Sequence, residues 1–239
     1  MIVGIFVLAS ASLGISAARF GTAYYYLFHQ IIFGLVPGAV LFFLALKLPY
    51  TFLRNWALPI LILAVFLMFL SLLPGIGFLH GGARRWITFG PISFQPAEFL
   101  KFAYVIYLAA WLESKSKAIS SFKFGFLPFV IMSAFVASFL VSQPDIGTLG
   151  VLMAAIMAMF FLSGGSFKQM ILLFVISLVI IGVLISLEPY RLDRVAVFFN
   201  PAEDPQGIGY QINQALIAVG SGGFWGRGFG LSRQKFSYL

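Results

Sequence analysis

The sequence lacks cysteine and holds few charged residues. It has 239 residues, of which 61% are hydrophobic and only 9% are charged. Without cysteine, disulfide scaffolds, thiolate nucleophiles and cysteine-based zinc sites are excluded. The two histidines, His29 and His80, are too far apart to indicate a histidine-rich metal site. A soluble domain carries about 25% charged residues, and a disordered chain is more polar still. The composition therefore excludes a soluble domain and a disordered chain.

The few charges that are present are mostly positive. Fifteen Lys and Arg against seven Asp and Glu give a formal charge of +8. The basic residues lie in short gaps between long apolar runs. We therefore expect membrane lipid head groups, or a phosphate-bearing substrate at the membrane surface, as partners, and no nucleic acid.

Seven apolar runs are long enough, or nearly so, to cross a membrane, which takes roughly 20 residues per helix. They are continuous, without the alternation of a β-barrel. The sequence predicts an all-α, polytopic transmembrane helical bundle over residues 1–187 and an incomplete extracytoplasmic loop over residues 188–239. A signal peptide is an alternative for the first run, although a basic n-region is missing. The runs lie near residues 1–16, 26–46, 56–73, 96–112, 124–141, 146–162 and 167–187.

Basic residues in the connections predict a cytoplasmic N-terminus, because cytoplasmic loops are enriched in Lys and Arg. In that orientation six basic residues lie inside and three lie outside in the short connections. The inside set is Lys47, Arg54, Lys115, Lys117, Lys123 and Lys168, and the outside set is Arg19, Arg84 and Arg85.

Charged residues at the start of the fourth run form the first candidate site on the predicted outer face. Pro96 suits the first turn of a helix, and Glu98 would meet the positive end of the helix dipole. Lys101 follows three residues later on the same face. The two charges either satisfy each other and fix helix packing, or shape a substrate cavity.

Two further polar segments lie on the same predicted face. Arg84 and Arg85 with Trp86 either anchor a helix end at the membrane interface or clamp a phosphate. Gln143 precedes Asp145, which is either the N-cap of the sixth run or another carboxylate of the site.

The last part of the chain is polar and rich in glycine. Residues 210–219 predict a short interfacial helix, followed by a Gly-rich segment over residues 220–230. That segment lacks the Gly-Lys-Ser/Thr of a phosphate-binding loop. No Ser-His-Asp group or metal triad can be assembled from the spacing, so the residues alone leave a transporter and an enzyme open.

Four segments in the same order resemble the signature of the SEDS family (shape, elongation, division and sporulation proteins), and the last residues are closer to its division branch, FtsW, than to its elongation branch, RodA. The resemblance implies a ten-span peptidoglycan glycosyltransferase that polymerises lipid II outside the bacterial cytoplasmic membrane, together with a class B penicillin-binding protein transpeptidase and other divisome proteins. The segments are residues 82–87, 95–101, 143–148 and the tail from 200 to 239.

The resemblance also assigns roles to residues. It implies supporting catalytic roles for Arg85, Glu98 and Lys101, and substrate binding by four more residues. The family's essential aspartate would follow Leu239, so we expect an incomplete and inactive fragment. The candidate cofactor is a divalent cation, Mg²⁺ or Mn²⁺, and no residue is assigned to bind it. The rival functions are a lipid II flippase and a non-catalytic divisome scaffold. The substrate-binding set is Arg84, Trp86, Gln143 and Asp145.

Overall fold

The computed structural model describes residues 2–80, 83–90, 92–186, 189–200, 207 and 209–232. Contacts between Cα atoms divide the chain into two compact units. Unit 1 comprises Met1–Lys47 and Leu184–Leu239, and unit 2 comprises Leu48–Val183.

Unit 1 is helical. Helix α2 continues through a π-helical turn, η1, into α3, so these elements form one uninterrupted helix. At the tight connection after α1, the Phe20 ring stacks on Tyr25 with centroids 3.8 Å apart. The Gly230 N–H donates to Ser10 Oγ at 2.8 Å, which ties the glycine-rich segment to α1. The elements are α1 (Ile2–Phe20), α2 (Tyr25–Gln30), η1 (Ile31–Leu35), α3 (Val36–Lys47), α10 (Pro189–Phe199) and α11 (Tyr210–Gly222).

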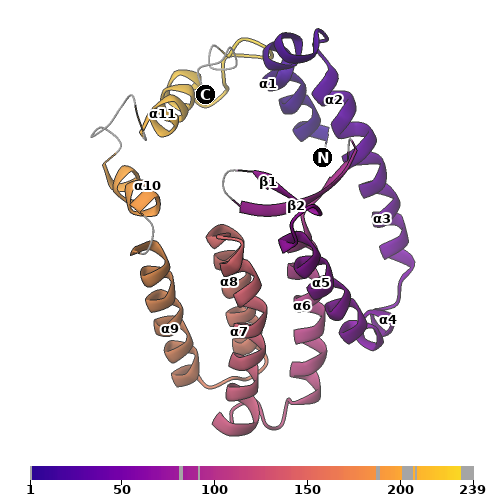
Figure 1. The fold of residues 1–239 in the computed structure, drawn as a ribbon, viewed down its shortest axis with the longest axis vertical. Coiled ribbons are helices and arrows are strands. Elements are labelled where there is room, and N and C mark those ends of the chain that lie inside the picture. The colour runs from indigo at the N-terminus through magenta and orange to yellow at the C-terminus, as the bar shows by residue number, and fades with distance from the viewer. Residues whose placement is uncertain are drawn as a thin grey trace. The chain divides into compact units, whose positions relative to one another are not determined.

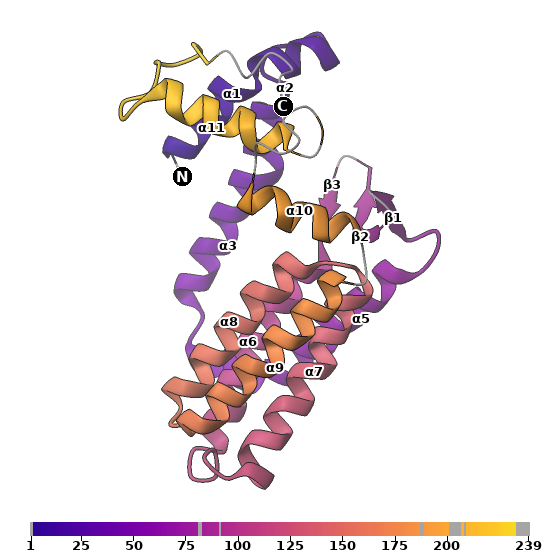
Figure 2. The ribbon, with the colours of Figure 1, turned by 90° about the vertical axis from the view of Figure 1, so that its left-hand side faces the viewer.

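Unit 2 is a bundle with a small sheet at one end, and Figure 2 shows α6 to α9 running alongside one another. Its core lies between α5, α6, α7 and α8, where Met68, Tyr104, Phe129 and Phe160 are fully buried. The elements are α4 (Tyr50–Asn55), α5 (Ala57–Leu72), β1 (Gly77–His80), β2 (Ala83–Phe89), β3 (Ile92–Phe94), α6 (Pro96–Ser114), η2 (Phe122–Phe126), α7 (Leu127–Ser142), α8 (Ile146–Leu162) and α9 (Phe167–Ser186), the last of which runs on into unit 1.

Every predicted apolar run falls on a helix, so the prediction of a helical, multi-pass membrane protein is confirmed. Within the described part of the chain, four helical stretches are long and apolar enough to cross a membrane: Val3–Phe20, Tyr25–Lys47, Phe122–Ser142 and Phe167–Ser186. Helices α5 and α8 are shorter apolar helices, and α6 carries Glu98, Lys101 and Glu113. The count of seven spans and the boundary at residue 187 stay predictions.

The connection between α5 and α6, for which no secondary structure was predicted, is a three-stranded antiparallel sheet in the order β1-β2-β3. Strands β1 and β2 are labelled in Figure 1 and β3 in Figure 2. The ladder pairs Ile87 with both Gly77 and Phe94. Ala83 and Ile87 are buried. The sequence does not reveal these two buried positions, because two arginines and a tryptophan lie between them. Gly77 lies so close to the backbone carbonyl of Ser71 that a side chain there has no room.

The last part of the chain matches its prediction in part. The expected helix from residue 210 is α11, which extends to Gly222. Helix α10 was not predicted, because its charges of both signs suggested an irregular loop, although Pro189 suits a first helical turn. Residues 82, 201–206, 208 and 233–239, which contribute to the family resemblance, lie outside the described residues.

Candidate functional site

Polar side chains from four segments of unit 2 gather at the end of the bundle where the sheet lies. Helices α5 and α7 end here, and α6 and α8 begin here, so chain segments far apart in the sequence meet. Hydrogen bonds join β2 and the residue before α6 to the turn between α7 and α8. The three polar segments that the sequence predicted on one face thus share one end of the bundle.

Arg85 connects the sheet to the α7–α8 turn. Its Nε donates to the carbonyl oxygen of Gln143 and its Nη2 to that of Pro144, both at 2.8 Å. These bonds orient the planar guanidinium without neutralising it, because a carbonyl carries no net charge. The remaining N–H groups of the guanidinium stay available to an anion.

Gln143 is almost completely buried, with 1% of its surface exposed. Its Nε2 donates to Ser71 Oγ at 2.7 Å, and its Oε1 has no partner among the described residues. The side chain therefore connects the α7–α8 turn to α5. Its predicted contact with substrate stays a prediction.

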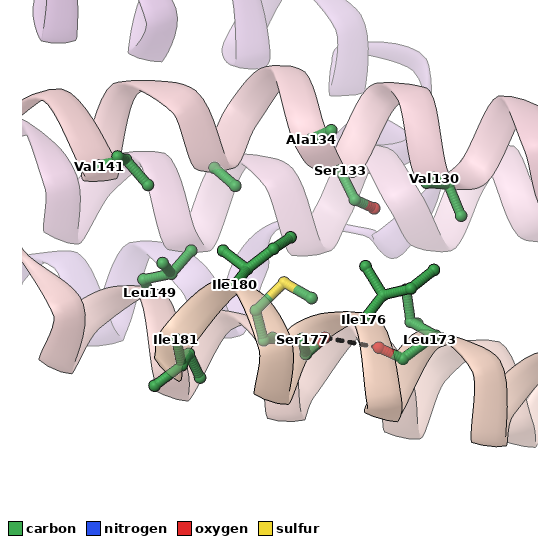
Figure 3. Close-up of a pocket in the computed structure, with 12 residues that line it drawn as sticks. Val130, Ser133, Ala134, Val141, Leu149, Leu173, Ile176, Ser177, Ile180 and Ile181 are labelled. Atoms are coloured by element: carbon green, nitrogen blue, oxygen red, sulfur yellow. Dashed lines mark hydrogen bonds between the residues drawn. The ribbon is translucent and has the colours of Figure 1, made fainter. Parts of the chain in front are cut away.

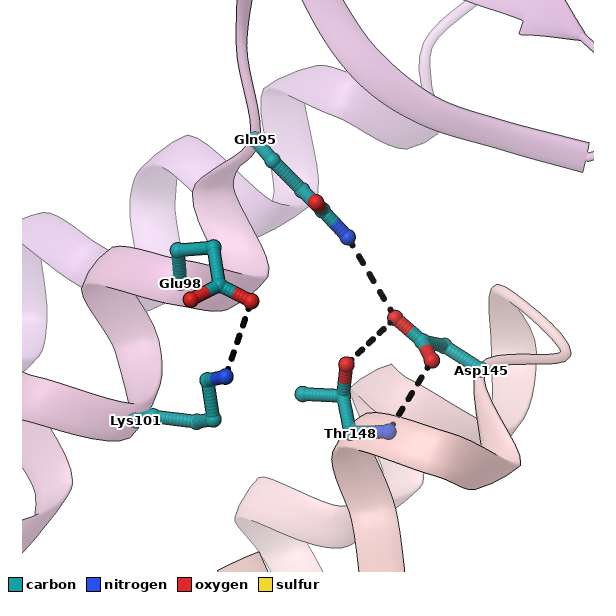
Figure 4. A network of polar contacts seen from close by, with 5 residues as sticks. All are labelled: Gln95, Glu98, Lys101, Asp145 and Thr148. Atoms are coloured by element: carbon teal, nitrogen blue, oxygen red, sulfur yellow. Dashed lines mark hydrogen bonds and ion pairs between the residues drawn. The ribbon is translucent and has the colours of Figure 1, made fainter. Parts of the chain in front are cut away.

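Asp145 is the N-cap of α8, as one of the two interpretations of the sequence proposed. Its Oδ1 accepts from the Thr148 backbone N–H at 3.1 Å, and its Oδ2 accepts from Thr148 Oγ1 at 2.8 Å. Gln95 Nε2, from the residue before α6, reaches the same Oδ2 at 3.4 Å (Figure 4). A cap does not exclude substrate binding, which stays a prediction.

Glu98 and Lys101 form the ion pair that their spacing predicts, with Lys101 Nζ 2.8 Å from Glu98 Oε1. The Glu98 side chain is 59% exposed and that of Lys101 25%. The pair lies beside the Gln95–Asp145 contact in Figure 4 and faces the space between α6 and α8. It is therefore accessible, and its contribution to stability is small.

Arg84 and Trp86 flank Arg85 on β2 and are both half-buried. In the ladder Arg84 pairs with Leu79 and Trp86 with Phe78. The ion pairs among the described residues are Arg54–Glu113 and Lys101–Glu98, so Arg84 and Arg85 have no carboxylate partner there. This end of the bundle therefore has positive charge to offer an anionic ligand.

Three residues of the site were missed as candidates: Ser71, Gln95 and Thr148. Thr148 has a recognisable signal, because a Thr three residues after an N-cap aspartate can donate to it. Ser71 has none, since a serine near the end of an apolar helix is not distinctive until its partner is known.

The described residues do not fit a divalent cation site. No group of three His, Cys, Asp or Glu side chains gathers among them. The Glu98 carboxylate is paired with Lys101, and Asp145 is occupied by Thr148 and Gln95. The described part of the chain therefore lacks the cluster of oxygen ligands that Mg²⁺ prefers.

An apolar groove of about 80 Å³ lies between α7, α8 and α9 (Figure 3). Ser133 and Ser177 are its polar residues, and Ser177 Oγ donates to the Leu173 carbonyl within its own helix at 2.7 Å. The groove suits a hydrocarbon chain. Its lining includes Val130, Val141, Leu149, Met153, Ile176 and Ile180.

The whole chain, residues 1–239, matches the model of the FtsW, RodA and SpoVE family, described as cell cycle protein. The chain therefore belongs to this family, which confirms the resemblance, and it is a multi-pass membrane protein.

Two curated relatives are similar to almost the whole of this chain. Stage V sporulation protein E of Bacillus subtilis is 37% identical over 240 residues, which cover 99% of this chain and 64% of the relative. The probable peptidoglycan glycosyltransferase FtsW of Trichlorobacter lovleyi is 36% identical, covering 99% and 62%. The chain thus spans less than two thirds of the length of these relatives.

Solved structures share the fold. One, described as the structural coordination of polymerization and crosslinking by a peptidoglycan synthase complex, has a TM-score of 0.69 and 29% identity, covering 93% of this chain and 64% of that one. The rod shape determining protein RodA of Thermus thermophilus has a TM-score of 0.52 and 24% identity, covering 74% and 58%, which shows the fold alone.

Proposed function

We propose that this protein contributes to a peptidoglycan glycosyltransferase that polymerises lipid II into glycan strands during bacterial cell division. Several relatives at 34–38% identity are named probable peptidoglycan glycosyltransferase FtsW. The observation that carries the proposal is the meeting of Arg85, Asp145 and the Glu98–Lys101 pair at one end of an apolar bundle.

The two arginines fit the charge of the substrate. Lipid II carries a pyrophosphate between its sugar and its undecaprenyl chain, and guanidinium groups bind phosphate oxygens in a forked geometry. Arg85 is held by two carbonyls and keeps N–H groups free, and Arg84 has no carboxylate partner among the described residues. Both can therefore bind the pyrophosphate and stabilise the charge that grows as it leaves.

In the proposed reaction, the acceptor 4-hydroxyl attacks the anomeric carbon of the donor sugar, and undecaprenyl pyrophosphate leaves. A carboxylate must take the hydroxyl proton. Glu98 is paired with Lys101, and Asp145 caps α8, so we assign both to supporting roles at the sugar or the pyrophosphate. Neither of them is assigned as the base that takes this proton.

The membrane placement follows from charge and hydropathy. With six basic residues inside and three outside, the N-terminus lies in the cytoplasm and the site faces the outside of the bacterial inner membrane. The groove between α7, α8 and α9 provides an apolar surface on which part of the undecaprenyl chain can lie. A head group at the sheet end and a chain along the helices match the two parts of lipid II.

A partner follows from the same proposal. The structural neighbour at 29% identity is part of a peptidoglycan synthase complex that coordinates polymerization and crosslinking. We propose that this protein likewise acts with a class B penicillin-binding protein, which crosslinks the new strands.

The test is polymerisation of fluorescent lipid II by the full-length protein, purified together with its transpeptidase. Glycan ladders on a gel are expected for the wild type. Arg85→Ala and Glu98→Ala should shorten or abolish them, whereas the exposed Ser138→Ala should not. Ladders of unchanged length and rate from both site variants would refute these assignments.

The main rival is a lipid II flippase, for which a cationic cavity is also suitable. Alternating access requires a binding site near the middle of the membrane. The charged residues of the candidate site lie instead at helix starts and on β2, at one end of the bundle. Proteoliposomes that translocate lipid II without polymerising it would reverse this ranking.

A further inference from the structure

A buried serine lies behind the candidate site and connects it to the core. Ser71, near the end of α5, is fully buried. Its Oγ donates to the Met68 carbonyl at 2.7 Å and accepts from Gln143 Nε2 at 2.7 Å. The Ser71 hydroxyl donates its one hydrogen to Met68, so it acts as an acceptor toward the Gln143 amide nitrogen.

The same glutamine also contacts Arg85, through its backbone. While its side chain is attached to Ser71, its carbonyl accepts from Arg85 Nε, and the next carbonyl, of Pro144, accepts from Arg85 Nη2. A continuous series of hydrogen bonds thus runs from α5, through the α7–α8 turn, to the guanidinium on β2.

We propose that Ser71 and the side chain of Gln143 are positioning residues that set the guanidinium of Arg85 for an anionic ligand. The inference rests on the proposed function for the identity of that ligand, the pyrophosphate of a lipid-linked substrate. It changes the expected role of Gln143 from contact with substrate to support of the residue that makes the contact.

The energetics favour this role. Gln143 Oε1 already lacks a partner among the described residues, so the bond to Ser71 is the one that holds the amide in place. Removing the hydroxyl leaves a second buried polar group unpaired, which is costly. The turn relieves that cost by shifting, and its two carbonyls then no longer fix the guanidinium. A displacement of about 1 Å at a site of this kind is enough to weaken function strongly.

Binding of undecaprenyl pyrophosphate to the chain in lipid nanodiscs tests the inference. Ser71→Ala is expected to weaken binding by about tenfold, the size of one hydrogen bond to a charged group. Gln143→Met, which keeps the volume and loses the amide, should weaken it by the same factor. The double variant Ser71→Ala with Arg85→Gln should bind no more weakly than Arg85→Gln alone, because Ser71 acts only through Arg85.

The control is Ser138→Ala on α7. Ser138 Oγ donates to Phe135 O at 2.7 Å, the same bond to the residue three before that Ser71 makes, but on an exposed face. Ser138→Ala should bind undecaprenyl pyrophosphate as tightly as the wild type does. Additive effects of Ser71→Ala and Arg85→Gln, or normal binding by Ser71→Ala, would overturn the inference.

A second readout separates this inference from the proposed function. Because the chain has no cysteine, spin labels can be attached at Thr88→Cys on β2 and Ser142→Cys on α7, both exposed positions. Ser71→Ala should broaden the distance distribution between the labels without any ligand, and Ser138→Ala should not. If the wild type fails to bind undecaprenyl pyrophosphate, the proposed function fails, while a broadened distribution still supports the positioning role. An unchanged distribution overturns it.

Discussion

The cap of α8 allows the structural and functional interpretations of Asp145 to be separated. Asp145→Ala removes the acceptor of the Thr148 N–H and Oγ1 bonds and of the weaker contact from Gln95. Loss of an N-cap costs about 1 kcal/mol, within a range of about 0.5–2 kcal/mol. The contact from Gln95 is long and adds little. We therefore expect Asp145→Ala to lower the free energy of unfolding by about 1–2 kcal/mol.

Asp145→Asn is the matched variant, because asparagine caps helices about as well as aspartate. It should change the free energy of unfolding by no more than about 0.5 kcal/mol. Thr148→Val keeps the backbone bond to Asp145 and loses only the hydroxyl bond. Its loss of unfolding free energy should therefore lie between those of Asp145→Asn and Asp145→Ala. Reversible unfolding in detergent, followed by tryptophan fluorescence, measures all three.

Two results would refute this reasoning. Equal destabilisation by asparagine and alanine would mean that the charge, and not the cap, stabilises α8. No loss with alanine would mean that the cap is not formed. If the series behaves as expected, Asp145→Asn also tests the proposed substrate contact, because weaker lipid II binding at unchanged stability then reflects the site alone.

Other substitutions have equally defined outcomes in unfolding experiments. Tyr104→Phe removes the buried 2.8 Å bond to Ser133 between α6 and α7 and should cost about 1 kcal/mol. Gly125→Ala forces a methyl against the backbone of the preceding turn and should cost about 1–3 kcal/mol, whereas Gly150→Ala, with open space around it, should stabilise α8 by up to about 1 kcal/mol. Glu98→Gln should change stability by less than about 0.5 kcal/mol, because the ion pair is exposed, so any loss of polymerisation reports on function.

Much of the fold was predictable because hydropathy alone reports membrane helices. Long apolar runs have no other stable arrangement in lipid than helices, and the helices match them closely. The sheet was not predictable in the same way. Strand β2 contains Arg84, Arg85 and Trp86 within seven residues, and its two buried positions are too few to give a clear alternation.

The candidate site was predictable where partners are close in sequence. The Glu98–Lys101 pair and the cap by Asp145 follow from spacings of three residues. The contacts of Arg85 were not predictable, because its two acceptors are backbone carbonyls 58 and 59 residues away, and every residue offers such a carbonyl. Ser71 was missed for the same reason, since its partner is 72 residues away.

The central claim is that the sheet end of unit 2, with Arg85 and the starts of α6 and α8, faces the outside of the cell. Single cysteines at Ser93 and Ser116 test it directly, because they flank the two ends of α6, a helix of 19 residues, and the native chain has no cysteine. A membrane-impermeant thiol reagent applied to intact cells should label Ser93→Cys, and should label Ser116→Cys only after the membrane is permeabilised. Labelling of Ser116→Cys alone in intact cells would place the site in the cytoplasm and contradict the account.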